Sequence, residues 1–368
     1  MKRLIVCCDG TWNRPDQTKQ GVASPTNVAK FSLALAEKDA KGHDQLLHYE
    51  TGVGTRRGER LAGGVFGVGL SRNVKDAYRF LVDCYEPGDK LYFLGFSRGA
   101  YTARSAVGLV RNAGILRPEH RDRVEQAYAL YRNPDRDSEP GGIASELFRR
   151  SYSHPDVYFE FVGVWDTVGA LGIPIDGFRP PWLSRLWTFH DTTLSSYVLN
   201  AYHALAIDER RSPFRPTLWQ QKAEVENQTL EQVWFSGAHC DVGGGYREPG
   251  LSEIPLLWMA EKARSCGLAF KPDHLVVTPA ADDDARRAGI HVSPDYSAEL
   301  HDSRTSYYRL QRAYDRRLAG DKGAEVDGGA LASSAKRRYD EDGSYRPAGL
   351  ADWIAANKPT TPVWEESG

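Results

Sequence analysis

Ser97 stands in the sequence context that turns a serine into a nucleophile. The apolar run Tyr92–Leu94 leads into Gly95-Phe96-Ser97-Arg98-Gly99, and alanines at helical spacing follow. This Gly-x-Ser-x-Gly pattern between a strand and a helix is typical of a nucleophile elbow, a sharp turn that lifts the hydroxyl clear of the sheet. Glycine suits positions 95 and 99, because side chains there would collide with the neighbouring strand and helix. We therefore predict Ser97 as the reactive residue, against the alternative of an ordinary strand-to-helix turn.

A serine nucleophile needs an acid and a base, and in α/β hydrolases these follow it in the order Asp or Glu, then His. Asp166 comes directly after the strand candidate Val157–Trp165, and His239 follows the strand candidate Gln232–Phe235. The carboxyl ends of parallel strands meet at one edge of a sheet, where ligands and catalytic loops gather. We therefore predict a triad of Ser97, Asp166 and His239.

A second triad remains open on the same reasoning. Asp241 could supply the acid, and the base would then come from a later histidine, of which His301 has the most loop-like surroundings. No later histidine stands in a motif, so we favour His239 with Asp166. Purely structural roles are a further alternative, because aspartates often cap turns and His239 could tie down the glycine loop that follows it.

Ester hydrolysis also needs main-chain amides that hold the oxyanion formed on the attacked carbonyl. One amide is expected from Arg98, the residue after the nucleophile. The second should come from the loop Asp9-Gly10-Thr11, which follows the first strand candidate, Leu4–Cys8. Gly10 or Thr11 would present it, and we predict Thr11 and Arg98 as the pair.

Strand-like and helix-like segments alternate along the chain, which predicts an α/β fold of the α/β-hydrolase kind: a mostly parallel sheet with helices on both faces. A further strand is expected at Gln45–Tyr49. The glycine-rich stretch Gly52–Gly69 lacks the pattern of a nucleotide-binding loop and is expected to form turns near the rim of the site. His203 and Asp208, in one of the expected helices, are assigned to core hydrogen bonds and ion pairs. Helices are expected at Asn27–Glu37, Ser71–Tyr85, Glu119–Arg132, Ile143–Arg150, Tyr197–Asp208 and Ile254–Cys266.

Residues 1–319 are expected to form one α/β-hydrolase catalytic domain, and residues 320–368 a partly mobile C-terminal extension. Within the domain, residues 170–215 are a candidate cap or lid, because they carry more aromatic surface than a plain connection requires, including Phe178, Trp182 and Trp187. The same aromatic residues could instead pack a small core under a long loop.

Composition argues against several classes of ligand. The formal net charge is −2 and Lys336-Arg337-Arg338 is the one compact basic cluster, so nucleic-acid binding is not expected. Five cysteines without paired spacing predict reduced thiols and no metal site, and no motif calls for a cofactor. No apolar run approaches the length of a membrane span, and the run after Met1 is too short for a signal peptide. A cytoplasmic location in the producing cell is therefore expected.

Several long motifs, in a fixed order, resemble one known family. They are Cys8–Thr11, Gly95–Arg104, Val164–Gly169, Ala206–Arg211 and Trp234–Tyr246. Together they resemble DUF2235, the uncharacterised α/β-hydrolase domain found in type VI secretion phospholipase effectors. The resemblance runs from the N-terminus to about Tyr246. It implies a Ser-Asp-His lipase or phospholipase, with Ser97 and His239 inside matching motifs, Asp166 as the acid, and His301 outside every matching stretch.

The motifs and the resemblance together predict a serine ester hydrolase that works through an acyl-enzyme. The expected substrate is a lipid or phospholipid ester, met in transient contact with a membrane surface. Delivery by type VI secretion, with a secretion-system or immunity partner, is what the resemblance implies. A soluble carboxylesterase is the nearest alternative, and a non-catalytic binding module on a hydrolase scaffold is the alternative from another class.

Overall fold

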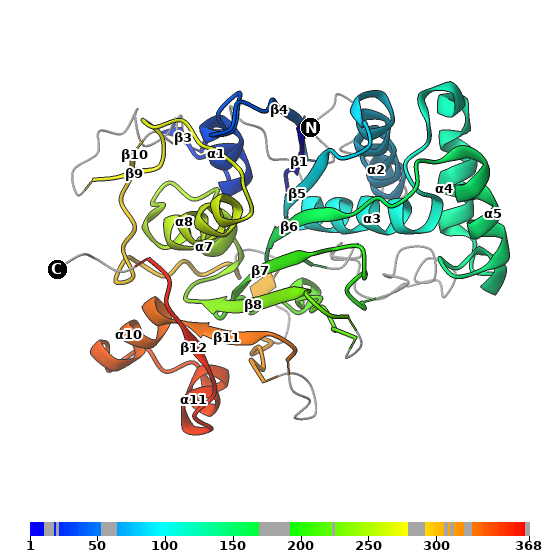
Figure 1. Ribbon diagram of the computed structural model, residues 1–368. Coiled ribbons are helices and arrows are strands. Elements are labelled where there is room, and N and C mark those ends of the chain that lie inside the picture. The colour runs from blue at the N-terminus through cyan, green and yellow to red at the C-terminus, as the bar shows by residue number, and fades with distance from the viewer. Residues whose placement is uncertain are drawn as a thin grey trace.

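A parallel β-sheet of eight strands forms the centre of the protein (Figure 1). The computed structural model describes residues 1–10, 18–19, 22–52, 65–168, 192–222, 225–278, 291–304, 308–309, 313–319 and 326–364. Every neighbouring pair of strands in this sheet is parallel. From one edge to the other the strands are β12 (Thr360–Thr361), β11 (Gly329–Ala332), β8 (Thr229–Phe235), β7 (Asn200–Ala206), β6 (Phe159–Trp165), β5 (Lys90–Phe96), β1 (Arg3–Cys8) and β4 (Gln45–Glu50).

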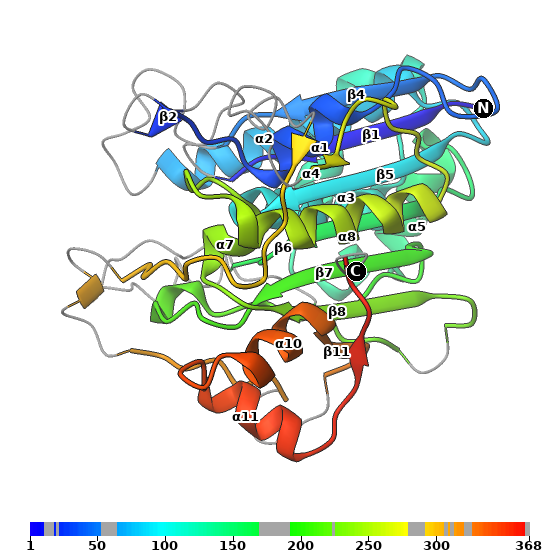
Figure 2. The same ribbon diagram turned by 90° about the vertical axis from the view of Figure 1, so that its left-hand side faces the viewer.

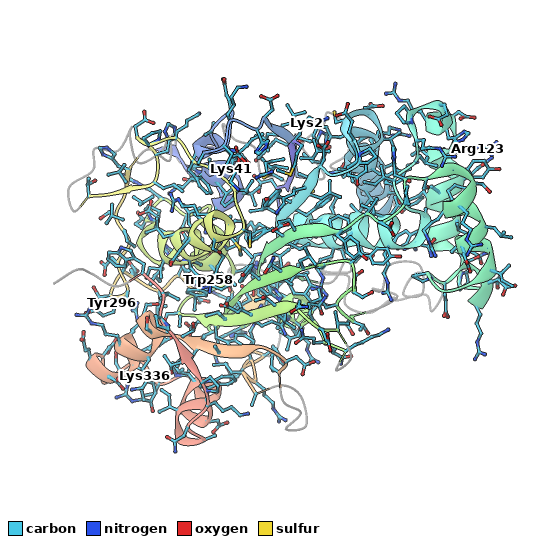
Figure 3. All side chains as sticks on the ribbon, viewed as in Figure 1. Lys2, Lys41, Arg123, Trp258, Tyr296 and Lys336 are labelled. Carbon is cyan, nitrogen blue, oxygen red and sulfur yellow. The ribbon has the colours of Figure 1, made fainter. Side chains whose placement is uncertain are left out.

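Helices cover both faces of the sheet, as an all-parallel sheet requires. On one face lie α2 (Val65–Cys84), α3 (Arg98–Ala113), α4 (Val124–Arg132) and α5 (Ile143–Tyr152). The other face is covered by α1 (Asn27–Ala34), α7 (His239–Gly243), α8 (Gly250–Ser265), α10 (Ser333–Glu341) and α11 (Ala348–Ala355). The large side chain of Trp258 in α8 is buried in this second core (Figure 3). The predicted fold class is therefore confirmed.

The central strands are buried on both faces, which explains their continuous apolar sequences. In β6 the run Phe-Glu-Phe-Val-Gly-Val-Trp contains one charged residue, and six of its seven residues are buried. A strand that is covered by helices on both sides shows no alternation of polar and apolar residues. Short two-stranded sheets, β2 (Thr18–Lys19) with β3 (Val22–Ala23) and β9 (Val276–Val277) with β10 (His291–Val292), lie outside the main sheet.

The order of the strands reverses next to β5, the strand that Ser97 follows. From β1 the chain passes to β4 on one side and then returns to β5 on the other, so the strand order reverses between β1 and β5. Parallel sheets bind ligands at the carboxyl ends of the strands beside such a switch point. Figure 2 shows the strands ending at a common edge, with α7 at that edge. Ser97, which directly follows β5, therefore lies beside this switch point.

One expected helix is wrong. Residues 197–208 were predicted as helix, whereas Asn200–Ala206 form β7, between β6 and β8. The sequence Asn-Ala-Tyr-His-Ala-Leu-Ala contains helix-forming alanine and leucine and is mostly apolar, and a short run of this kind fits either element. Pairing with strands on both sides decides it.

Several other helices begin or end at residues that differ from the predicted ones. Helix α1 ends at Ala34 and not at Glu37, and the segment predicted as helix over 119–132 begins with a 3₁₀ helix, Pro118–Arg123, before α4. Helix α2 begins at Val65, so the last five residues of the glycine-rich stretch 52–69 are helical and not turns. Residues 53–64 lie outside the described part of the chain.

Much of the candidate cap lies outside the described part of the chain, whereas the described C-terminal residues pack onto the main sheet. Of the range 170–215, residues 170–191, with the aromatic residues Phe178, Trp182 and Trp187, lie outside the described residues, and Asn200–Ala206 belong to the sheet. Residues 320–325 of the predicted C-terminal extension also lie outside the described residues. Beyond them, β11 pairs with β8 and β12 pairs with β11, so residues 326–364 extend the main sheet. Among the described helices, none combines the length and the apolarity needed to cross a bilayer.

Candidate active site

Ser97 occupies a strained turn between β5 and α3. Its backbone has φ 58° and ψ −120°, a conformation that non-glycine residues rarely adopt. A Cβ at Gly95 would lie 2.6 Å from the carbonyl oxygen of Gly99, and a Cβ at Gly99 would lie 2.1 Å from that of Cys8. The steric reason for both glycines is therefore confirmed. The turn has the geometry of a nucleophile elbow.

Asp166 lies at the same edge, one strand away from Ser97. Phe96 of β5 and Trp165 of β6 are in register, and the main-chain N–H of Ser97 donates to the carbonyl of Trp165 at 3.1 Å. The side chain of Asp166 is fully buried. Its carboxylate accepts hydrogen bonds from the main-chain N–H of Ala206 at 3.1 Å and from both terminal nitrogens of Arg316, at 2.5 and 3.0 Å. The orientation of the acid is therefore fixed from several directions.

His239 joins the same group of residues from the end of β8. It is the first residue of α7, and its Nδ1 lies 2.6 Å from Asp166 Oδ2. The imidazole packs between two aromatic rings, with centroid distances of 4.6 Å to Phe96 and 5.0 Å to Phe214. Because Nδ1 is held by a carboxylate, Nε2 is the nitrogen left to exchange a proton with a nucleophile. Phe96 directly precedes Ser97, so the ring packs against the strand end that carries the serine.

Burial and charge set the protonation states of this pair. Burial lowers the pKa of His239, and its hydrogen bond to Asp166 acts against that shift. Burial alone would raise the pKa of Asp166, but the charges of Arg316 and His239 hold it well below its usual range. At neutral pH the acid is therefore ionised and the imidazole is neutral. A neutral imidazole that is oriented by a carboxylate can act as a general base.

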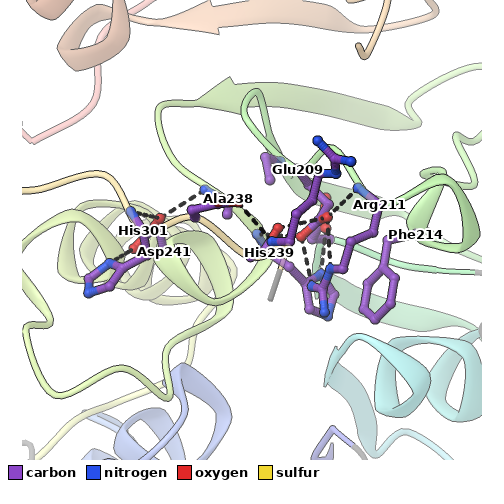
Figure 4. A network of polar contacts seen from close by, with 12 residues as sticks. Glu209, Arg211, Phe214, Ala238, His239, Asp241 and His301 are labelled. Carbon is purple, nitrogen blue, oxygen red and sulfur yellow. Dashed lines mark hydrogen bonds and ion pairs between the residues drawn. The ribbon is translucent and has the colours of Figure 1, made fainter. Parts of the chain in front are cut away.

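The alternative pair, Asp241 and His301, also forms a hydrogen bond. His301 Nδ1 lies 2.6 Å from Asp241 Oδ1, and the ring stacks on Tyr246 with a centroid distance of 4.0 Å. Asp241 Oδ2 accepts the main-chain N–H groups of Ala238 and His301, at 2.9 and 3.3 Å. Figure 4 shows Asp241 and His301 on one side of Ala238 and His239 on the other. Asp241 thus ties two segments together, as a structural role would require.

Of the two predicted oxyanion donors, the structure describes Arg98 and not Thr11. Arg98 is the first residue of α3, where main-chain N–H groups and the helix dipole favour negative charge. The N–H of Gly10 donates to Asp9 Oδ1 at 2.6 Å, while Oδ2 of Asp9 accepts the hydroxyl groups of Thr26 and Tyr49. The N–H of Gly10 is therefore already hydrogen-bonded to the side chain of the preceding residue. Thr11 lies outside the described residues.

His203 and Asp208 have the core roles that the sequence suggests, although His203 lies in a strand. His203 Nε2 accepts the N–H of Thr167 at 3.1 Å, and burial lowers the pKa of the ring to about 3. Asp208 Oδ2 accepts the N–H of Gly237 at 2.7 Å and the hydroxyl of Tyr345 at 2.8 Å. The ring of His203 is thus a neutral hydrogen-bond acceptor behind the turn at Asp166.

Sequence reasoning missed two buried charges beside the pair of Asp166 and His239. Arg316 forms the ion pair with Asp166, and Glu209 Oε2 accepts the main-chain N–H of His239 at 3.3 Å. Glu209 lies in the motif Ala206–Arg211, which could have drawn attention to it. Arg316 lies in a polar stretch that carries no motif. Among the described residues, no three His, Cys, Asp or Glu side chains are grouped so as to hold a metal ion.

Comparison with known proteins gives one family and several distant relatives. The family model for the catalytic domain of Tle1-like phospholipase effectors of the type VI secretion system (T6SS) matches residues 2–262. The uncharacterized protein YEL023C of Saccharomyces cerevisiae is 29% identical over 235 residues, which are 58% of this chain and 32% of the yeast protein. This chain therefore spans about a third of that relative.

Two solved structures are similar at low identity. A crystal structure of an uncharacterized protein from Pseudomonas aeruginosa gives a TM-score of 0.44 at 17% identity, covering 79% of this chain and 49% of that one. The Tle1 effector bound to the VgrG spike of the type VI secretion system gives a TM-score of 0.35 at 20% identity, covering 66% of this chain and 51% of the effector. This chain therefore spans about half of each of these proteins.

Proposed function

We propose that this chain, which belongs to the family of Tle1-like T6SS phospholipase effector catalytic domains, is a serine hydrolase that cleaves phospholipid esters through an acyl-enzyme. The observation that carries the proposal is the 2.6 Å hydrogen bond between His239 and Asp166, at the sheet edge where Ser97 occupies its elbow. Family membership supports the phospholipid substrate. It also supports delivery by the type VI secretion system as the setting in which the enzyme acts.

The proposed reaction follows from the protonation states of the site. The hydroxyl oxygen of Ser97 attacks the acyl carbonyl while Nε2 of His239 takes the hydroxyl proton. Asp166, held by Arg316, stabilises the imidazolium that forms. His239 then gives the proton to the departing alcohol, which leaves an acyl group on Ser97. Water attacks this acyl-enzyme by the same route and releases a fatty acid.

Main-chain amides complete the proposed mechanism. The tetrahedral intermediates carry a negative charge on the former carbonyl oxygen, and each preorganised donor contributes about 3 kcal/mol to the transition state. We assign one donor to Arg98, at the N-terminus of α3, and the second to Thr11. Gly10 is the weaker candidate because its N–H already donates to Asp9.

Labelling with a fluorophosphonate tests the nucleophile. Wild-type protein should take one label on the peptide that contains Ser97, and Ser97→Ala should take none. Ser105→Ala is the matched control, because Ser105 is a buried serine on the same helix, α3, and its replacement should leave labelling unchanged. Equal labelling of wild type and Ser97→Ala would show that the nucleophile is wrongly assigned. Absence of any label on folded wild-type protein would favour a non-catalytic module.

Substrate class is tested by comparing lipids with a short soluble ester. Fatty acid released from phosphatidylglycerol vesicles should exceed the turnover of p-nitrophenyl butyrate, and both activities should disappear in Ser97→Ala. A wild-type protein that cleaves the short ester and leaves the vesicles intact is a carboxylesterase, and the phospholipase proposal then fails.

A further inference from the structure

Arg211 is a fixed cation beside the proposed catalytic histidine. Its guanidinium lies over the ring of Phe214 at 3.6 Å from the centroid, and the edge of that ring meets His239, with centroids 5.0 Å apart. Figure 4 shows Arg211, Phe214, His239 and Glu209 side by side. The positive charge of Arg211 therefore lies a single aromatic ring away from the imidazole.

A buried carboxylate holds this guanidinium in place. Arg211 donates from Nε and Nη2 to Glu209 Oε1 and Oε2, at 2.9 and 2.7 Å, and Glu209 is fully buried. The carboxylate is itself held by the N–H of His239 at 3.3 Å and by the hydroxyl of Ser303 at 3.0 Å. A guanidinium that is fixed in this way loses little conformational entropy when it binds a ligand.

One arm of the guanidinium is left for a ligand. Nη1 of Arg211 makes no hydrogen bond to any of the described residues, and 14% of the side chain is exposed to solvent. Arg98, the residue after Ser97, adds a second cation nearby: burial, with a smaller contribution from the charge of Arg211, lowers the pKa of Arg98 to about 10. Arg98 directly follows Ser97 and Arg211 lies one aromatic ring from His239, so two guanidinium groups stand next to the proposed catalytic residues.

We propose that Arg211 forms an anion subsite that binds the phosphate group of a phospholipid while the neighbouring ester bond lies at Ser97. This inference rests on the proposed function and names the residue that selects phospholipids over neutral glycerides. Guanidinium groups match the geometry of phosphate oxygens, and charge-assisted hydrogen bonds of this kind are among the strongest in proteins. In a glycerophospholipid only the glycerol backbone separates the phosphate from the acyl ester, which suits a cation placed one ring from the general base.

The test compares two soluble substrates that differ only in the phosphoglycerol head group. Dihexanoyl phosphatidylglycerol and dihexanoylglycerol, both below their aggregation limits, carry the same acyl chains. Arg211→Gln should lower kcat/KM for the phospholipid by about 10- to 100-fold, mainly through KM, and change kcat/KM for the diacylglycerol by less than about threefold. Glycerophosphoglycerol should inhibit diacylglycerol turnover by the wild type and not by Arg211→Gln.

Two further variants separate recognition from structure. Arg210→Gln is the matched control, because Arg210 is exposed and its ion-pair partner among the described residues is Asp315, at 3.0 Å, so both substrates should be turned over as by the wild type. Glu209→Gln/Arg211→Gln removes both charges of the buried pair and should show the same selective loss as Arg211→Gln.

Each other outcome overturns the inference. Equal losses on both substrates would mean that Arg211 acts on His239 through Glu209, and no loss on either would mean that it binds nothing. Either of these results, with the phospholipid still cleaved by the wild type, would refute the subsite alone. A wild-type protein that cleaves the diacylglycerol and spares the phospholipid would refute both the subsite and the phospholipid substrate. A protein that cleaves neither substrate and takes no fluorophosphonate label would refute the proposed function as well.

Discussion

Replacing Arg316 by glutamine should destabilise the fold and disable the site together. Arg316 donates from Nη1 and Nη2 to the two carboxylate oxygens of Asp166, and from the same nitrogens to the carbonyl oxygens of Ala206 at 2.8 Å and Phe214 at 2.6 Å. The side chains of Asp166 and Arg316 are 0% and 1% exposed. Glutamine is shorter and uncharged, so it leaves a buried carboxylate with the imidazole of His239 as its remaining ionisable partner.

The magnitude follows from the burial of this pair. Removing one partner of a buried ion pair costs about 3–5 kcal/mol, because the remaining charge is left in a medium of low polarity. A typical domain has only about 5–15 kcal/mol of stability, so the free energy of unfolding should fall by a large fraction. Disturbing the acid should also slow fluorophosphonate labelling at least tenfold, because the orientation of His239 depends on it.

The loss of stability in Arg316→Gln should depend on pH. The pKa of Asp166 is lower in the folded chain than in the unfolded chain, so its contribution to stability is present above the unfolded pKa, about 4, and is lost as the pH falls through the folded value. Without Arg316, burial is left to raise this pKa, and protonation then relieves the buried charge. The difference in stability between wild type and Arg316→Gln should therefore be largest at neutral pH and narrow as the pH falls towards 4 and below.

Urea unfolding at pH 7 and pH 4 measures this difference. Arg317→Gln is the matched control, because Arg317 is the next residue and is exposed. Asp166→Asn/Arg316→Gln completes a double-mutant cycle, in which the coupling energy between the two side chains should be about 3 kcal/mol or more. If Arg316→Gln unfolds like Arg317→Gln, or if the coupling energy is near zero, the ion pair does not support the site and the reasoning is refuted.

Three more outcomes follow from the same geometry. His239→Ala should abolish fluorophosphonate labelling and His301→Ala should leave it intact; because both rings make a 2.6 Å bond to an aspartate, equal losses would contradict the choice between the two pairs. Since burial lowers the pKa of His239, the midpoint of the rise in the wild-type labelling rate with pH should lie below the ordinary imidazole value of about 6.5, and a midpoint above that value would contradict the lowered pKa. Gly99→Ala should lower the free energy of unfolding in urea by about 3 kcal/mol, because its new Cβ would lie 2.1 Å from the carbonyl oxygen of Cys8. Gly141→Ala is the control, because its Cβ would meet no atom within 4 Å, and it should unfold like the wild type. Equal unfolding midpoints for the two variants would mean that the elbow tolerates a side chain.

Elements that can be recognised from a short stretch of sequence could be predicted. The elbow at Ser97 combines an apolar strand, two glycines and a helix within a few residues, so its pattern can be recognised from those residues. The positions of Asp166 and His239 at the sheet edge could also be predicted, because each follows a strand that can be recognised from its own residues. The rule that parallel strands end at one edge then brings them together.

What could not be predicted depends on neighbours that are distant in the sequence. Strand β7 has both faces buried, so it shows neither the alternation of an exposed strand nor the polar face of a surface helix, and only its pairing with β6 and β8 identifies it. The two hydrogen-bonded pairs, His239 with Asp166 and His301 with Asp241, are chemically alike. Contacts made in the fold distinguish them: His239 packs against Phe96, which precedes Ser97, and Asp166 follows Trp165, whose carbonyl accepts the N–H of Ser97, whereas the ring of His301 stacks on Tyr246.

Arg316 shows how far the site extends beyond the region that the family model describes. The match ends at residue 262, yet Arg316 reaches back across 150 positions to both oxygens of Asp166. Ser303, also outside the match, holds Glu209 at 3.0 Å, and Glu209 in turn holds Arg211. Leaving a buried carboxylate without a partner charge is costly, so Arg316 contributes to the pair of Asp166 and His239 from outside the matched region.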